Sequence, residues 1–193
     1  NYDEIKRLDV LICDNVIIQK DCDIIQDILH VLPNLRTKQS KTYSFPKTCP
    51  ACGSSVERRE GEVAYYCSNQ NCFAQERERF YHFVSKTGFD IRGLGPKIID
   101  QLIDAGLLHE YADLFELTVG DLEPLERFAE KKASNIIQEI QARRTTTLPR
   151  FIYALGIRNI GEETAIDLAE KFSSIEKIKK AKLEDFDSIL DIG

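Results

Sequence analysis

The sequence predicts a mixed, mainly helical fold made of three consecutive parts. Three observations support this: β-branched runs near the start, four cysteines in two close pairs, and a helical segment that repeats itself to the last residue. The content of 42% hydrophobic and 30% charged residues is typical of a folded, globular chain. We expect a β segment with a linker over residues 1–45, a small metal-binding module over 46–74 and a helical array over 75–193.

The first part is expected to be the end of a β domain. Residues 15–20 and 28–32 are rich in β-branched side chains and are split by polar residues, as in two neighbouring strands. Two strands cannot bury a core alone, so this part predicts a partner segment. Residues 33–46 are rich in Lys, Thr, Ser and Asn and read as a linker or long loop. Because the chain starts at Asn1 and stops inside a repeat, we expect it to be an internal piece of a longer protein.

The second part contains a cysteine pattern that predicts a structural zinc site. Its ligands would be Cys49, Cys52, Cys67 and Cys72, two close pairs separated by an insert of hairpin length. Disulfides are disfavoured because the sequence has no secretory signal. Four thiolates complete a tetrahedral shell and leave no position for a reactive water, so the zinc is expected to hold the fold together and not to catalyse.

Other cysteines, histidines and nearby cations carry weaker signals. Cys13 and Cys22 lie outside the spacing pattern and are expected to be small buried side chains. The histidines share no motif with one another or with the cysteines; they are His30, His82 and His109. Three cations near the cysteines either offset the negative zinc–thiolate charge or are ordinary surface residues; they are Lys47, Arg58 and Arg59.

The third part is a repeat of about 32 to 34 residues, seen when Gly95, Ala129, Gly161 and Gly193 are aligned. Four, seven and eight residues after each aligned position the side chains are apolar, which places them on one helical face. Helical stretches are also expected before each hairpin, over residues 75–86, 119–128, 148–155 and 183–190. Each unit is therefore expected to be helix, tight hairpin, helix, with the fourth unit stopping at its hairpin.

The hairpins are candidate phosphate sites because a helix N-terminus offers free amides and a favourable dipole to an anion. The first hairpin is the best candidate, since glycines let the backbone approach a ligand closely, whereas the second lacks both glycines and is expected to serve packing or to bind through its lysines. The third is expected to contact DNA as well, although two glutamates follow it, and most of the contact is expected from the first and third hairpins with the basic stretch between them. The predicted DNA-binding residues are Gly93, Leu94, Gly95, Lys97, Lys131, Lys132, Arg158, Asn159 and Gly161.

The net charge of −6 argues against an indiscriminate polycation, but the distribution matters more. Between Lys131 and Arg158 there are six basic residues and one acidic residue, a stretch that could follow a phosphate backbone. No apolar run approaches the roughly 20 residues of a bilayer span, so a cytoplasmic protein without membrane contact is the default expectation.

Several segments in order resemble the NAD⁺-dependent bacterial DNA ligases. Residues 1–16 are similar to the end of the ligase OB-fold, with Cys13 and Cys22 at positions where that family has glycine. Residues 49–54, Cys67 and 72–75 are similar to the ligase zinc finger. Residues 83–95 and 153–158 are similar to the first and third helix-hairpin-helix units of the family.

The resemblance implies the DNA-binding portion of an enzyme that seals single-strand nicks during replication and repair. It implies nicked duplex DNA and an adenylation domain of the same chain as partners, a monomer, and a bacterial cytoplasmic, nucleoid-associated location. The ligase nucleophile sits in a Lys-x-Asp-Gly motif, and this sequence has no Asp-Gly dipeptide. NAD⁺, catalytic Mg²⁺ and the chemistry are therefore expected to belong to other residues, and the chain alone is expected to be inactive.

Three other interpretations remain open at this point. A stand-alone zinc and helix-hairpin-helix adaptor of a repair protein would also bind DNA, but it would begin with a complete domain and a start methionine. A zinc-ribbon module for protein interaction would have no DNA affinity. A helical array that only packs on itself would use its glycines as simple connections.

Overall fold

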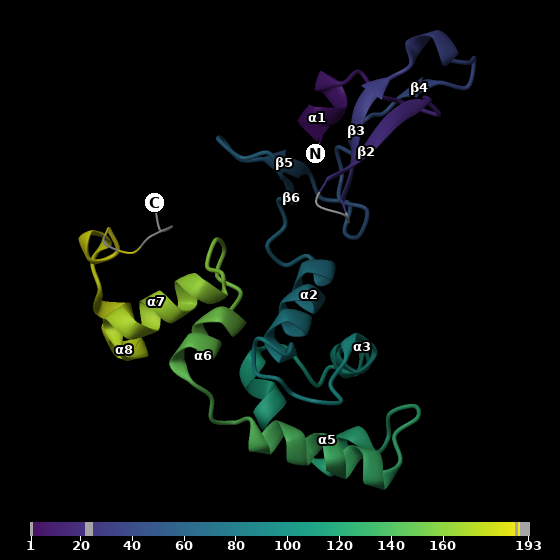
Figure 1. The fold of residues 1–193 in the computed structure, drawn as a ribbon. Helices are drawn as coiled ribbons and strands as arrows, with labels where there is room; N and C mark the ends of the chain where they lie inside the picture. Colours follow the sequence, from purple (N-terminus) through teal and green to yellow (C-terminus); the bar gives the residue numbers. More distant parts are fainter. Residues whose placement is uncertain (1, 22–24, 188, 190–193) are drawn as a thin grey trace. The chain divides into compact units, whose positions relative to one another are not determined.

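The computed structural model describes residues 2–21, 25–187 and 189 (Figure 1). The chain separates into two compact units, Asn1–Cys72 and Phe73–Gly193, and each is described by itself. The first unit contains the strands and the second contains helices, so the mainly α fold with a short β segment is confirmed. Among the described residues, no helix combines the length and the apolar character that a membrane span requires.

The first unit is built from three antiparallel strand pairs: β1 (Leu11–Ile12) with β4 (Lys41–Thr42), β2 (Val16–Asp21) with β3 (Ile25–Val31), and β5 (Val56–Arg58) with β6 (Tyr65–Cys67). The β2–β3 hairpin is the pair of strands that the sequence predicts. Residues 33–46 hold only the short 3₁₀ helix η1 (Pro33–Leu35) and β4, in keeping with the expected loop. Within the described part of this unit, Cys72 is the one buried hydrophobic residue, so the unit has almost no core of its own.

A helix at the start of the chain was not predicted. Helix α1 (Tyr2–Arg7) occupies a segment that the sequence reading assigned to β-structure. Acidic residues in its first turn, Asp3 and Glu4, and basic residues in its last turn, Lys6 and Arg7, complement the helix dipole. The prediction failed because six residues give too little periodicity to distinguish a helix from a strand.

The expectation that Cys13 is buried is wrong, because its side chain is exposed. Cys13 adopts a left-handed backbone with φ of +70° in a tight turn, in which the Asp14 N–H donates to the Leu11 carbonyl oxygen at 3.1 Å. The Arg36 guanidinium pairs with the buried Asp14 carboxylate at 3.1 Å and lowers its pKa. The turn therefore forms without glycine. Cys22 lies outside the described residues.

The second unit confirms the predicted series of helix pairs. Its α-helices are α2 (Phe73–Val84), α3 (Pro96–Asp104), α4 (Val119–Leu122), α5 (Glu130–Ala142), α6 (Leu148–Ala154), α7 (Glu162–Phe172) and α8 (Ile175–Lys180), with 3₁₀ helices η2 (Tyr111–Phe115) and η3 (Leu183–Asp185). The three complete units are α2–α3, α4–α5 and α6–α7. The helix predicted over 119–128 is shorter than expected, and the one predicted over 183–190 is represented by η3.

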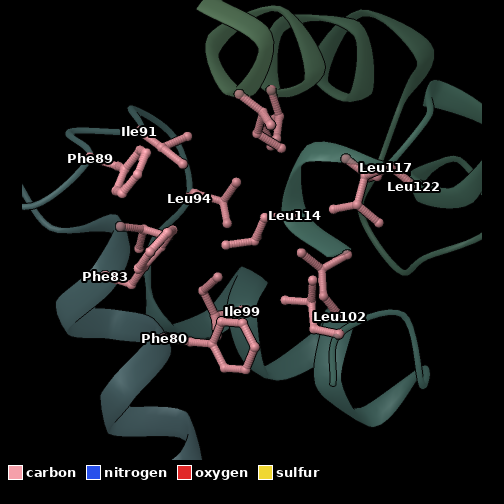
Figure 2. Packing of buried hydrophobic residues seen from close by; sticks show 14 of the residues in the cluster. Phe80, Phe83, Phe89, Ile91, Leu94, Ile99, Leu102, Leu114, Leu117 and Leu122 are labelled. Atoms are coloured by element: carbon pink, nitrogen blue, oxygen red, sulfur yellow. The ribbon is translucent and has the colours of Figure 1, made fainter. Parts of the chain in front are cut away.

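The repeated apolar positions form the core. Four and seven residues after the aligned hairpin positions lie Ile99, Ala133, Ala165, Leu102, Ile136 and Leu168, and all are at most 4% exposed. The first two repeats share one cluster, in which Leu94 and Leu114 lie between α2 and α5 (Figure 2). The third repeat forms a second cluster with Ile189. Burial of this stripe confirms the periodicity argument.

The two clusters are joined through α2 and α6. The His82 imidazole Nε2 lies 2.7 Å from the Tyr153 carbonyl oxygen, and their rings are 4.6 Å apart. Phe89 and Phe151 are in edge contact at 6.3 Å. His82 is thus a packing residue between repeats, while His30 and His109 are exposed.

Candidate metal centre and nucleic-acid interface

The four patterned cysteines come together at the end of the first unit. Their sulfur atoms all lie within 4.8 Å of one another, and those of Cys52 and Cys67 are 3.4 Å apart. Thiolates arranged tetrahedrally at about 2.3 Å from a zinc ion would be about 3.8 Å from one another, so the donor set fits zinc. Gly53, with φ of +73°, closes the first turn, and its N–H donates to the Cys49 carbonyl oxygen at 2.9 Å.

Without a metal ion, these thiols differ in how readily they ionise. Hydrogen bonds from Ser54, first from its hydroxyl, lower the pKa of Cys52 to about 6. Burial raises the pKa of Cys67 to about 12. Crowded thiols cannot all lose their protons without compensation, and a divalent metal ion supplies it. In the described part of the chain this is the only group of three or more candidate ligands that are close enough to share an ion.

The cations near this cluster have partners other than the sulfur atoms. Arg58 forms an ion pair with Asp3 at 2.7 Å. The Arg59 guanidinium lies over the Tyr66 ring, 5.5 Å from its centroid. Of the two interpretations open at the sequence level, the structure favours ordinary surface and packing roles for these two arginines.

The three described hairpins share one backbone path. The residue that begins each, Gly93, Arg127 or Asn159, has a left-handed φ of +83°, +66° or +62°. The next residue is Leu94, Phe128 or Ile160, and its N–H donates three residues back at 3.1 to 3.4 Å. The third residue is the extended N-cap of the following helix. Unit two therefore builds the same turn without glycine, so the absence of glycine there bears on how closely a ligand can approach the backbone and not on the turn itself.

The helices that follow these hairpins lack side-chain caps. No capping hydrogen bond is made at Gly95, Ala129 or Gly161, the N-caps of α3, α5 and α7. Elsewhere in the same unit the Asp113, Asp121 and Ser174 side chains accept backbone N–H groups at the starts of η2, α4 and α8. First-turn amides without a protein cap are positioned to bind an anion. The first-turn amides at the three hairpins therefore have no side-chain cap, which is also true at Thr147, the N-cap of α6.

The first two hairpins open onto one cleft of about 910 Å³. Gln101 of α3 donates to the Glu126 carbonyl oxygen at 3.2 Å and links the two sides. The lining residues come from both hairpins and from the start of α3 and α5: Gly93, Gly95, Pro96, Lys97, Ile98, Asp100, Gln101, Glu126, Arg127 and Lys132. The cleft therefore brings three cations to two uncapped helix starts.

Two acidic residues in the cleft are already paired. The Asp100 carboxylate accepts hydrogen bonds from Arg77 and from the Tyr81 hydroxyl, both at 2.5 Å. Glu126 forms an ion pair with Arg127 at 3.3 Å, and both side chains are more than three-quarters exposed. An exposed pair of this kind is weak and can open when an anionic ligand competes for the arginine.

Comparison with known proteins identifies the family. Residues 48–74 match the NAD-dependent DNA ligase C4 zinc finger domain. Residues 89–142 match a SAM-like helix-hairpin-helix tandem, and residues 150–193 match a helix-hairpin-helix motif. A protein named DNA ligase from Oleidesulfovibrio alaskensis is 44% identical over the whole chain. The chain is homologous to one region of the NAD-dependent DNA ligases. It spans 28% of the length of that relative.

The hairpin residues predicted to bind DNA in this ligase region differ in whether their side chains line the cleft. Leu94 is 3% exposed and belongs to the core, so its side chain is removed from the set of DNA contacts. Lys132 lines the cleft, with its ammonium 4.2 Å above the Phe128 ring, whereas Lys131 is exposed outside the lining. The third-hairpin residues do not line the cleft; they are Arg158, Asn159 and Gly161. The fourth hairpin, 191–193, lies outside the described residues.

Several arginines in the basic stretch of the ligase region bind other parts of the same chain. Arg143 pairs with Asp90 at 3.1 Å, and Arg150 donates to the Gly88 carbonyl oxygen at 3.1 Å. Arg144 donates to the Phe115 carbonyl oxygen at 3.4 Å. These arginines join neighbouring repeats, so the idea of a continuous basic track from Lys131 to Arg158 is revised.

Arg127 is the residue that sequence reasoning missed. It was noted only as a replacement for glycine, yet its side chain is 85% exposed and lines the cleft opposite α3. The sequence feature that could have indicated Arg127 was its position in the repeat, two residues before Ala129. A cation at the tip of a hairpin can offset the loss of close backbone approach.

Proposed function

We propose that this chain is the DNA-gripping part of an NAD⁺-dependent DNA ligase that seals single-strand nicks in duplex DNA. The family matches and the 44% identical DNA ligase support this assignment. The observation that carries the proposal is the cleft between the first two hairpins, where Lys97, Arg127 and Lys132 accompany two uncapped helix starts.

The geometry favours contact with the DNA backbone over reading of bases. Amides at a helix start and mobile cations bind phosphate oxygens, which are alike at every step of the duplex. Two hairpins on one cleft can hold neighbouring phosphate groups at the same time. Binding is therefore expected to be independent of sequence and sensitive to salt. The local cations also make an overall charge of −6 compatible with DNA binding.

The third hairpin provides a second contact region in this proposal. Gly161 is an uncapped helix start, and Asn159 repeats the left-handed backbone of Gly93. Glu162 and Glu163 lie in the first turn of α7 and compete with a phosphate for the same dipole. We therefore propose that the first two hairpins supply most of the affinity, and that the third, with Arg158, extends the contact along the duplex.

In this proposal the chemistry belongs to other residues of the parent ligase. Adenylation by NAD⁺, the catalytic Mg²⁺ and the transfer of AMP to the 5′-phosphate require a Lys-x-Asp-Gly motif, and this sequence has no Asp-Gly dipeptide. We expect the chain alone to be an inactive monomer that positions nicked DNA for an adenylation domain in the bacterial cytoplasm. A zinc ion held by the four cysteines would stabilise the finger and take no part in catalysis.

The proposal is tested by comparing binding of a nicked duplex to the wild-type chain and to the double variant Arg127→Ala, Lys132→Ala. Removal of two phosphate contacts is expected to weaken binding by about 100-fold or more, because charge-assisted hydrogen bonds contribute about 1.5–3 kcal/mol each and about 1.4 kcal/mol corresponds to a tenfold change. The matched control is Lys179→Ala, which removes an exposed lysine of α8 that does not line the cleft. Equal affinities for the double variant and the control would contradict the proposed interface.

A further inference from the structure

We infer that the cysteine-bound metal controls the docking of helix α1, through contacts between α1 and the zinc finger. We call the residues that make these contacts the α1 clasp. They are Tyr2, Asp3, Phe45, Arg58 and Tyr65. All five residues lie in the first unit. The inference rests on the metal site and does not depend on the proposed DNA contacts.

The polar half of the clasp is a two-point ion pair. Arg58, the last residue of β5, donates from Nη1 to Asp3 Oδ1 at 2.9 Å and from Nη2 to Asp3 Oδ2 at 2.7 Å. This paired geometry fixes orientation as well as distance. The Arg58 guanidinium also lies 5.8 Å from the centroid of the Tyr65 ring. One arginine of the finger therefore holds the carboxylate of α1 on one side and an aromatic ring of β6 on the other.

The apolar half of the clasp is an aromatic group. Phe45 and Tyr65 are stacked with ring centroids 4.1 Å apart, and Tyr2 lies 5.4 Å from Phe45 and 6.1 Å from Tyr65. Tyr43 adds an edge contact to Tyr2 at 5.9 Å. Such aromatic pairs stabilise beyond their buried area, by about 0.5–1.5 kcal/mol each. Tyr2 thus reaches the finger from the helix, and Phe45 from the loop before it.

Neither helix α1 nor the zinc finger has a hydrophobic core that could keep it folded on its own. Helix α1 has six residues and none of them is buried, whereas isolated helices shorter than roughly 12 residues are marginal in water. The finger has two strands of three residues, which is too little sheet to be stable alone. Its folding therefore depends on the metal.

The register of the finger connects the metal directly to the clasp. Arg58 pairs with Tyr65, and Cys67, which pairs with Val56, lies only two residues further along β6. If the metal leaves, this short hairpin loses its anchor, and Arg58 and Tyr65 lose the positions that hold α1. By linkage, docked α1 strengthens metal binding by the same factor by which the metal strengthens docking, so weakening the clasp should weaken metal binding.

The inference is tested in the whole chain by two measurements. The first is zinc retention against a chromophoric chelator for Asp3→Asn and for its matched control Glu4→Gln. Both variants remove one carboxylate charge from α1, but Glu4 pairs with Arg7 of its own helix and not with the finger. We expect Asp3→Asn to weaken zinc binding by about two- to five-fold, the range for exposed ion pairs, and Glu4→Gln to leave it unchanged.

The second measurement is millisecond hydrogen exchange with zinc bound and after chelation. The Leu8 and Val10 amides, which donate to the Glu4 and Ile5 carbonyl oxygens, report on α1. We expect their exchange to rise on chelation while amides of α3 and α5 keep their protection. Equal zinc retention in the two variants would overturn the inference. So would α1 exchange that ignores zinc, or a loss of protection throughout the helical unit.

Discussion

Replacement of Gly95 by valine at the first hairpin should weaken DNA binding without loss of stability. Gly95 has φ of −84° and ψ of 173°, an extended conformation that valine adopts readily. A Cβ atom added there would meet no atom within 4 Å, so the branch point of the valine side chain has open space around it. Stability should change little, because the gain of about 0.4–1 kcal/mol from restricting the unfolded chain is offset by the poor preference of valine for the N-cap position of α3.

DNA affinity is expected to fall in the same variant. The new isopropyl group stands at the start of α3, where it blocks a phosphate from the first-turn amides. Loss of one charge-assisted hydrogen bond of about 1.5–3 kcal/mol predicts binding weakened by about 10- to 100-fold. The matched control is Ala129→Val, which enlarges a Cβ already present at the equivalent position of hairpin two and should cost about two- to five-fold.

Fluorescence anisotropy with a labelled nicked duplex measures the affinities, and thermal unfolding measures the stabilities. The reasoning would be refuted if Gly95→Val bound like the wild type, or if it lost stability. A larger effect at Ala129 than at Gly95 would show that the second hairpin makes the closer backbone approach.

Three further substitutions probe the fold. Gly93→Ala should destabilise by about 1–2 kcal/mol, because φ of +83° is unfavourable for a residue with a Cβ; an unchanged midpoint in urea would refute this. Ile99→Ala should cost about 2–5 kcal/mol in the same assay, since Ile99 is 0% exposed; a cost below 1 kcal/mol would contradict its place in the core. A hydrogen bond from the Thr118 hydroxyl lowers the pKa of Asp121 below its ordinary 3.8, so stability from this carboxylate is present above pH 3.8 and is lost as pH falls through the folded-state pKa. Asp121→Asn should therefore flatten the loss of stability on acidification, which pH-dependent unfolding measures, and an identical profile would be the contrary result.

The sequence was sufficient for features that are local or periodic. The spacing of Cys49, Cys52, Cys67 and Cys72 predicted a cluster that the structure forms, because structural zinc sites typically take their cysteines from two closely spaced pairs. The repeat predicted a buried stripe that includes Ile99 and Leu102, because helical periodicity determines which side chains share a face.

Features that depend on tertiary contacts were not predictable. The cleft joins hairpins separated by 34 residues, and nothing local to Arg127 indicates that it lies opposite Lys97. Arg143 and Arg150 counted as free charges in the sequence but bind Asp90 and the Gly88 carbonyl oxygen of an earlier repeat. Charge counts do not reveal such internal partners, so the basic stretch was given too large a role.

The backbone of the second hairpin shows a related limit. It has no glycine, yet Arg127 takes the left-handed conformation at φ of +66°, which the sequence alone did not indicate. The buried Phe128 side chain and the Phe128 N–H bond to the Leu125 carbonyl oxygen fix the turn from both sides. Tertiary packing therefore outweighs the local preference of the residue, at a cost of about 1–2 kcal/mol.

The salt dependence of binding to a nicked duplex tests the central proposal most directly. If two hairpins and their cations hold phosphate groups, the logarithm of the binding constant should fall linearly with the logarithm of salt concentration. Three cleft cations, Lys97, Arg127 and Lys132, predict a slope of roughly −2 to −3, at about −0.9 per neutralised phosphate. Undetectable binding at low salt, or an affinity that does not change with salt, would contradict the account.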